Sequence, residues 1–140
     1  MSFHESTFKE NFDNVSATID RLSEAFPKAG IVLTVSPVAL GCTWSGADVV
    51  VANMASKTTL RAVAHEICRA YDQVTYWPSF EFAMMEDVFL ADGRHVKRSA
   101  VKRIISAFIE AHEAGSSILH RTWGDVLPDG KTGSSDFLSG

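Results

Sequence analysis

Two short apolar segments, each lying between stretches with helical spacing, constrain the fold of this chain most strongly. Residues 31–35 are Ile-Val-Leu-Thr-Val and residues 74–77 are Val-Thr-Tyr-Trp, and a proline follows each within two positions. Short runs of β-branched and aromatic residues that are apolar on both faces are typical of parallel strands buried between helices. We therefore expect an α/β fold with a short parallel sheet of two or three strands.

The longest apolar stripe belongs to residues 8–26, where apolar side chains recur at steps of three and four. Thr7 and Glu10 match a capping box, in which each side chain accepts a hydrogen bond from the other residue's free backbone amide. Pro27 and Gly30 end the predicted helix. Its expected buried positions are Phe8, Phe12, Val15, Ile19, Leu22 and Phe26.

Two further helices are expected. One extends from about residue 56 to 70, with Ser56 or Asn53 as its cap, and the other covers roughly residues 97–113. Their expected inward-facing side chains are Leu60, Val63, Ala64, Ile67 and Tyr71 in the first, and Val101, Ile104, Ile105, Phe108 and Ile109 in the second.

The remaining segments carry weaker patterns. Residues 49–51, three consecutive valines, fit either a short strand or a buried loop segment, and residues 79–92 are expected to be a long connection. Five of the nine glycines lie in residues 115–140, together with five serines. This composition predicts a polar tail after a domain of residues 1–114.

Composition excludes several classes of protein. The chain has 140 residues, of which 46% are hydrophobic, and a net charge of −4. A single domain of this size can bury a hydrophobic core without disulfides or metals. The negative net charge argues against a general nucleic-acid binder, which needs a predominantly basic surface. Five basic residues do fall within residues 94–103, and they form either a solvated helix face or a surface that attracts an anionic substrate.

The sequence also gives expectations about the protein's location. Cys42 and Cys68 lie in no CxxC spacing, which favours free thiols in a reducing compartment. The first residues lack the basic and apolar regions of a signal peptide, and no apolar run approaches the ~20 residues of a membrane span. We expect a cytoplasmic protein that binds neither membrane nor nucleic acid.

Metal and nucleotide chemistry is not indicated. His65-Glu66 begins like the HExxH zinc motif, but Arg69 stands where the second histidine must lie. The chain contains neither GxGxxG nor GxxxxGK[ST], so it lacks both common phosphate-binding loops. We therefore expect no metal and no cofactor.

The segment Asp92-Gly93-Arg94-His95 carries the strongest indication of catalysis. An Asp three residues before a His can hold the imidazole in one tautomer and stabilise its protonated form, as in a Ser-His-Asp triad. The alternative is that Asp92 only caps the last turn and that His95 is a surface residue. No GxSxG motif is present, and Ser36 is followed by Pro37 with no adjacent glycine to form an oxyanion hole. Cys42 is interpreted as a small packed residue rather than a nucleophile.

Five short blocks occur in one order along the chain and together resemble the carboxyl-terminal half of GSCFA-domain proteins, which are similar to the SGNH (GDSL-like) hydrolases. The resemblance covers about residues 3–112. The blocks are Leu33 to Val38, Val51 to Asn53, Ser56-Lys57 with Leu60-Arg61, Tyr76 to Glu81, and Asp92 to Val96.

The resemblance implies a three-layer α/β/α fold with a central parallel sheet. It also implies that Asp92 is the acid and His95 the general base of the active site, while the catalytic serine belongs to an amino-terminal block. That block cannot be placed in this sequence, and two or three strands make a poor sheet by themselves. We therefore expect a fragment, or a subunit completed by an amino-terminal half.

Four further polar residues match recurring positions of the family: Asn53, Lys57, Arg61 and Glu81. They are candidate substrate-binding residues, with Lys57 or Arg61 facing a substrate oxyanion. The structural alternative assigns Asn53 to a helix cap, pairs Arg61 with Glu81 or another acid, and leaves Lys57 solvated.

Two functional hypotheses follow. The first is a serine ester hydrolase or acyltransferase, catalytically incomplete in this chain, that acts on a small-molecule or carbohydrate ester. The second is a non-catalytic α/β interaction module that forms a homo-oligomer or binds a partner through an exposed strand edge.

Overall fold

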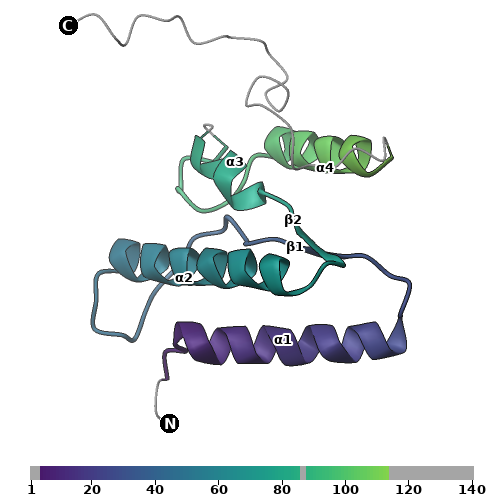
Figure 1. The fold of residues 1–140 in the computed structure, drawn as a ribbon. Coiled ribbons are helices and arrows are strands. Elements are labelled where there is room, and N and C mark those ends of the chain that lie inside the picture. Colours follow the sequence, from purple (N-terminus) through teal and green to yellow (C-terminus); the bar gives the residue numbers. More distant parts are fainter. Residues whose placement is uncertain (1–3, 86–87, 114–140) are drawn as a thin grey trace, which may run out of the picture. The chain divides into compact units, whose positions relative to one another are not determined.

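The computed structural model describes residues 4–85 and 88–113, which form a mixed α/β structure (Figure 1). The chain divides into two units, and the boundary between them falls within the last helix, after Val101. In chain order the elements are α1 (Phe8–Ala25), β1 (Ile31–Leu33), α2 (Val49–Ala70), β2 (Val74–Tyr76), α3 (Ser79–Met85) and α4 (Arg98–Glu113).

Strands β1 and β2 form a two-stranded parallel sheet, as the sequence predicts. Ile31 lies opposite Val74 and Leu33 opposite Tyr76, and the Trp77 amide extends the pairing with a bond to the Leu33 carbonyl at 2.7 Å. Parallel neighbours need a long crossover, which α2 supplies. Because α2 must return the chain to the start of the next strand, its amino-terminal half lies toward the carboxyl edge of the sheet.

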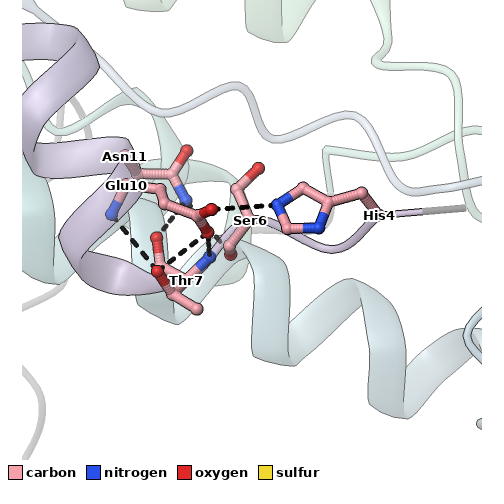
Figure 2. A network of polar contacts seen from close by, with 5 residues as sticks. All are labelled: His4, Ser6, Thr7, Glu10 and Asn11. Atoms are coloured by element: carbon pink, nitrogen blue, oxygen red, sulfur yellow. Dashed lines mark hydrogen bonds and ion pairs between the residues drawn. The ribbon is translucent and has the colours of Figure 1, made fainter.

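The capping box at the start of α1 is confirmed (Figure 2). Thr7 Oγ1 accepts from the Glu10 amide at 3.2 Å, and Glu10 Oε2 accepts from the Thr7 amide at 2.8 Å. The second carboxylate oxygen of Glu10 contacts the His4 ring at 3.1 Å. The Thr7 amide and hydroxyl, and then the His4 ring, lower the pKa of Glu10.

The core of the first unit forms where α1, α2 and the sheet meet, and Figure 1 shows the two helices side by side. Ile19, Val63, Ile67 and Val74 are its buried members. The predicted stripe of α1 is buried only in its middle, because Phe8, Leu22 and Phe26 stay exposed. Partly buried side chains complete the core: Phe12, Val15, Ile31, Leu33, Cys68 and Tyr71.

Helix α2 begins seven residues earlier than the sequence predicts, so the expected caps Ser56 and Asn53 are wrong. Asp48 is the cap, and its Oδ1 accepts from the Val50 amide at 2.8 Å. Residues 49–51 are therefore the first turn of a helix rather than a strand or buried loop, and Val50 and Val51 are exposed.

The expected connection over residues 79–92 contains structure of its own. Helix α3 occupies its first half, and residues 88–97 form a small hairpin in which Phe89 and Val96 make an antiparallel bridge. The Leu90 amide donates to the His95 carbonyl, and the Lys97 amide donates to the Val88 carbonyl, each at 2.7 Å. This hairpin holds the Asp92–His95 segment at its tip.

Helix α4 agrees with the predicted helix over residues 97–113, but its apolar residues are less buried than expected. Val101, Ile105 and Ile109 are exposed rather than inward-facing. The predicted tail, residues 115–140, lies outside the described residues. Among the described helices, none is long and apolar enough to cross a membrane.

Candidate active site

The hairpin tip is built around Asp92 and Gly93. Asp92 Oδ1 accepts hydrogen bonds from the amides of Arg94 and His95, each at 3.0 Å, which is the pattern of an Asx turn. Gly93 adopts a φ of +67°, a left-handed conformation that favours glycine. The Asp-Gly sequence therefore dictates this turn locally.

The same turn brings the side chains of Asp92 and His95 together. His95 Nδ1 donates a hydrogen bond to Asp92 Oδ2. The His95 ring, together with the amides of Arg94 and His95, lowers the pKa of Asp92 well below its ordinary value. Because Asp92 holds Nδ1, the unshared electron pair of the neutral ring lies on Nε2.

His95 Nε2 is available for proton transfer. The side chain of His95 is 71% exposed, and Nε2 makes no hydrogen bond to any residue of 4–85 or 88–113. Asp92 does not cap α4, because that helix begins only at Arg98. The alternative in which His95 is a surface residue agrees with its exposure, and the ring is nevertheless oriented by a carboxylate.

Arg94 connects this turn to the loop that leaves β1. Its Nε lies 3.5 Å from the Ala39 carbonyl oxygen, and its guanidinium lies 3.0 Å from where a Cβ at Gly41 would be. The amide of the same Ala39–Leu40 peptide group donates to Asn53 Oδ1 at 3.0 Å. Asn53, predicted as a substrate-binding or capping residue, thus holds one side of a peptide group whose other side faces Arg94.

Arg61 and Glu81 form the ion pair that the structural alternative anticipates. Arg61 Nε lies 2.5 Å from Glu81 Oε1, and the Tyr76 hydroxyl donates to Glu81 Oε2 at 2.8 Å. The Arg61 guanidinium also stacks over the Tyr76 ring, 4.1 Å from its centroid. Burial, followed by the Glu81 carboxylate, raises the pKa of Tyr76. Tyr76 was not among the predicted site residues, although its position as an amphipathic residue at a strand end was a usable signal.

Lys57 lies one helical turn from both Asn53 and Arg61 on α2. The structural alternative expected Lys57 to be solvated, but the residue is buried. Its exposed fraction is 8%, and it has no hydrogen bond or ion pair to any described residue. Burial lowers the pKa of Lys57. The amine therefore has no ion-pair partner among residues 4–85 and 88–113.

None of the serines in the described segments hydrogen-bonds to the His95 ring. Ser36 is exposed and accepts from the Val38 amide at 3.3 Å, and Cys42 is an exposed free thiol. Ser79 is buried, where its hydroxyl contacts Thr34 Oγ1 and donates to the Val35 carbonyl at 3.1 Å. Within these segments, no group of three His, Cys, Asp or Glu side chains could hold a metal ion.

The structure is thus that of an α/β protein with a β-α-β unit and an exposed Asp92–His95 contact. Residues 1–108 match the model of the GSCFA family, so the chain belongs to this family and the resemblance is confirmed. No curated protein and no solved structure matches the chain.

Proposed function

We propose that this chain supplies the acid–base pair of a serine ester hydrolase or acyltransferase of the SGNH (GDSL-like) type, with acylated carbohydrate as a candidate substrate. The observation that carries the proposal is the Asp92–His95 contact, which orients the ring while Nε2 stays exposed and unpartnered among the described residues. This arrangement is the one a general base requires, because the orienting group and the proton-accepting atom lie on opposite sides of the ring.

In the proposed reaction, His95 Nε2 accepts the proton of a serine hydroxyl as the serine oxygen attacks the ester carbonyl. The imidazolium then donates that proton to the departing alkoxide, which leaves as an alcohol. Water attacks the acyl-serine in hydrolysis, whereas an acceptor alcohol attacks in acyl transfer. In both cases His95 accepts the proton of the attacking group and returns it to the serine oxygen.

The serine of this proposal lies outside residues 4–85 and 88–113. A complementing amino-terminal half, carrying a Gly-Asp-Ser-like or GSCFA-like block, is the proposed source. The exposed Nε2 suits this arrangement, since a second segment can dock against the ring without displacing a neighbour.

The test combines this chain with an amino-terminal segment of a GSCFA-family protein that carries such a serine block, and follows hydrolysis of p-nitrophenyl acetate. We expect His95→Ala to reduce the rate by about 10²–10⁴-fold, the usual contribution of a general base. His65→Ala is the matched control, because His65 is an exposed histidine on α2 with no contact to Asp92. Unchanged activity of the His95→Ala protein in the active mixture would refute the role of His95.

One observation favours a second function, that of an interaction module that binds a second copy of itself. Within the described residues the sheet has two strands of three residues each, and all of β1 is only half-buried. A free strand edge presents unpaired backbone N–H and C=O groups, to which a further strand can be added. Sedimentation over a wide concentration range is expected to show self-association if this function is correct. A monomer at every concentration, or serine labelling by a fluorophosphonate in the complemented mixture, would contradict it.

A further inference from the structure

Lys57 is the residue whose surroundings the proposed chemistry does not explain. Lysines are almost never buried to this degree without a partner, because removing an ammonium group from water is costly. The exposed fraction of Lys57 is 8%, on a helix whose neighbouring buried positions Val63, Ala64 and Ile67 are apolar. Its Nζ retains some solvent-accessible surface.

The neighbouring polar groups are already engaged. Asn53, one turn before Lys57, accepts from the Leu40 amide. Arg61, one turn after it, occupies Glu81 Oε1, while the Tyr76 hydroxyl occupies Oε2. Glu81 is therefore engaged, and no other carboxylate of the described segments forms an ion pair with the Lys57 amine.

The position of Lys57 in the fold is one where α/β proteins bind ligands. Arg61 stacks over Tyr76, the last residue of β2, and thereby marks the carboxyl end of that strand. Lys57 lies four residues nearer the start of α2, about 6 Å farther along the helix. Lys57 thus lies on the amino-terminal half of a crossover helix, the half toward the carboxyl edge of the parallel sheet.

We propose that Lys57 is an oxyanion-binding residue, which pairs its amine with a carboxylate or phosphate group of a ligand held at the carboxyl edge of the β1–β2 sheet. A ligand oxyanion would supply the counter-charge that the described residues lack, and the partly dry surroundings strengthen such a pair relative to one in water. The lowered pKa of Lys57 agrees with a desolvated amine that awaits a counter-ion. This inference does not depend on the proposed ester chemistry, because it concerns binding alone.

The test titrates the chain with inorganic phosphate and, separately, with acetate, at an ionic strength kept constant with chloride. Backbone amide shifts of residues 53–61 are followed by ¹H–¹⁵N NMR. We expect saturable shifts in the unmodified chain and in the Lys28→Met control, which removes an exposed lysine. Lys57→Met is expected to weaken binding at least tenfold, and saturation by phosphate only or by acetate only would identify the preferred oxyanion.

Stability provides the second readout. Because Lys57→Met removes an unpaired amine but keeps a side chain of similar shape, its thermal midpoint without added anion should equal or exceed that of the unmodified chain. Phosphate should raise the midpoint of the unmodified chain and leave that of the variant unchanged. A lower midpoint in the variant would show that the amine has a structural role instead.

A measurement on the unmodified chain covers the case in which Lys57→Met does not fold. Acetylation of Lys57 by acetic anhydride, followed by mass spectrometry, should slow when the preferred oxyanion is present, while Lys28 should react at an unchanged rate. Equal acetylation of Lys57 with and without both anions, or equal affinity in the folded variant, would overturn the proposal.

Discussion

At the residue scale, the two carboxylate oxygens of Asp92 have separate tasks. Oδ1 accepts from two backbone amides and so maintains the turn, while Oδ2 accepts from His95 Nδ1 and so orients the ring. The same carboxylate therefore stabilises both the conformation of the turn and the Nδ1–H tautomer of the imidazole. The pair depends on local sequence alone, because Asp92, Gly93 and His95 lie within four residues.

Asp92→Asn should keep the hydrogen bonds that stabilise the turn but lose the orientation of the His95 ring. The amide oxygen of asparagine can still accept from the backbone, so the turn should persist, but the neutral side chain no longer fixes the proton on Nδ1. ¹⁵N NMR of the imidazole is expected to show an increased population of the Nε2–H tautomer. An unchanged tautomer distribution in Asp92→Asn would mean that the carboxylate does not orient the ring.

The same variant should change how stability depends on pH. Because the native pKa of Asp92 is lowered, its ionised form favours the folded state above the ordinary pKa of an Asp, and this contribution is lost as the pH falls through the native pKa. Urea unfolding between pH 2 and pH 6 should therefore show a shallower loss of stability with acid in Asp92→Asn than in the unmodified chain. Asp72→Asn is the control, because Asp72 is exposed and its carboxylate makes no hydrogen bond or ion pair to any described residue, and it should leave the profile unchanged.

At the scale of elements, the first residues of α1 and α2 show when local sequence is sufficient to predict where a helix begins. The Thr7–Glu10 box was predicted and is present, because both partners lie within one turn and need no tertiary contact. The start of α2 was predicted incorrectly, because three consecutive valines favour strand by propensity. Asp48 caps them into a helix instead, and the strand positions of the sheet are filled by residues 31–33 and 74–76.

Thr7→Ala tests the contribution of the α1 cap. Loss of the hydroxyl that accepts from the Glu10 amide should lower the free energy of unfolding by about 1 kcal/mol, measured by urea denaturation at pH 7. The lowered pKa of Glu10 means that its contribution is present above the ordinary pKa of a Glu and fades as the pH falls below it. Thr18→Ala, within the same helix but away from the cap, should cost less. Equal effects of the two variants would argue against the capping role.

At the scale of the whole molecule, the first unit depends on a small core. Its fully buried side chains include Ile19 and Ile67, whereas many large apolar residues remain exposed, among them Trp44, Val50 and Met85. Small cores leave a narrow margin of stability, so each buried side chain accounts for a large share of it.

Ile67→Ala measures that dependence. The side chain has an exposed fraction of 0% and packs in the cluster with Ile19 and Val74, so its truncation should cost about 3 kcal/mol in urea denaturation. Leu60→Ala, on the same helix but more than one-third exposed, should cost clearly less. A similar loss in both variants would place the core elsewhere.

Local sequence patterns determined the two buried strand segments, the capping box of α1 and the Asp92–His95 contact. Each of these follows from periodicity or from partners a few residues apart. Only the tertiary structure decided the contacts of Asn53 and Arg61 on α2, because their partners come from residues 40 and 81. Hydrogen bonds and ion pairs between distant segments cannot be assigned from spacing along the chain. For the same reason, only the folded chain reveals that Lys57 is buried between two engaged neighbours without a counter-charge in the described residues.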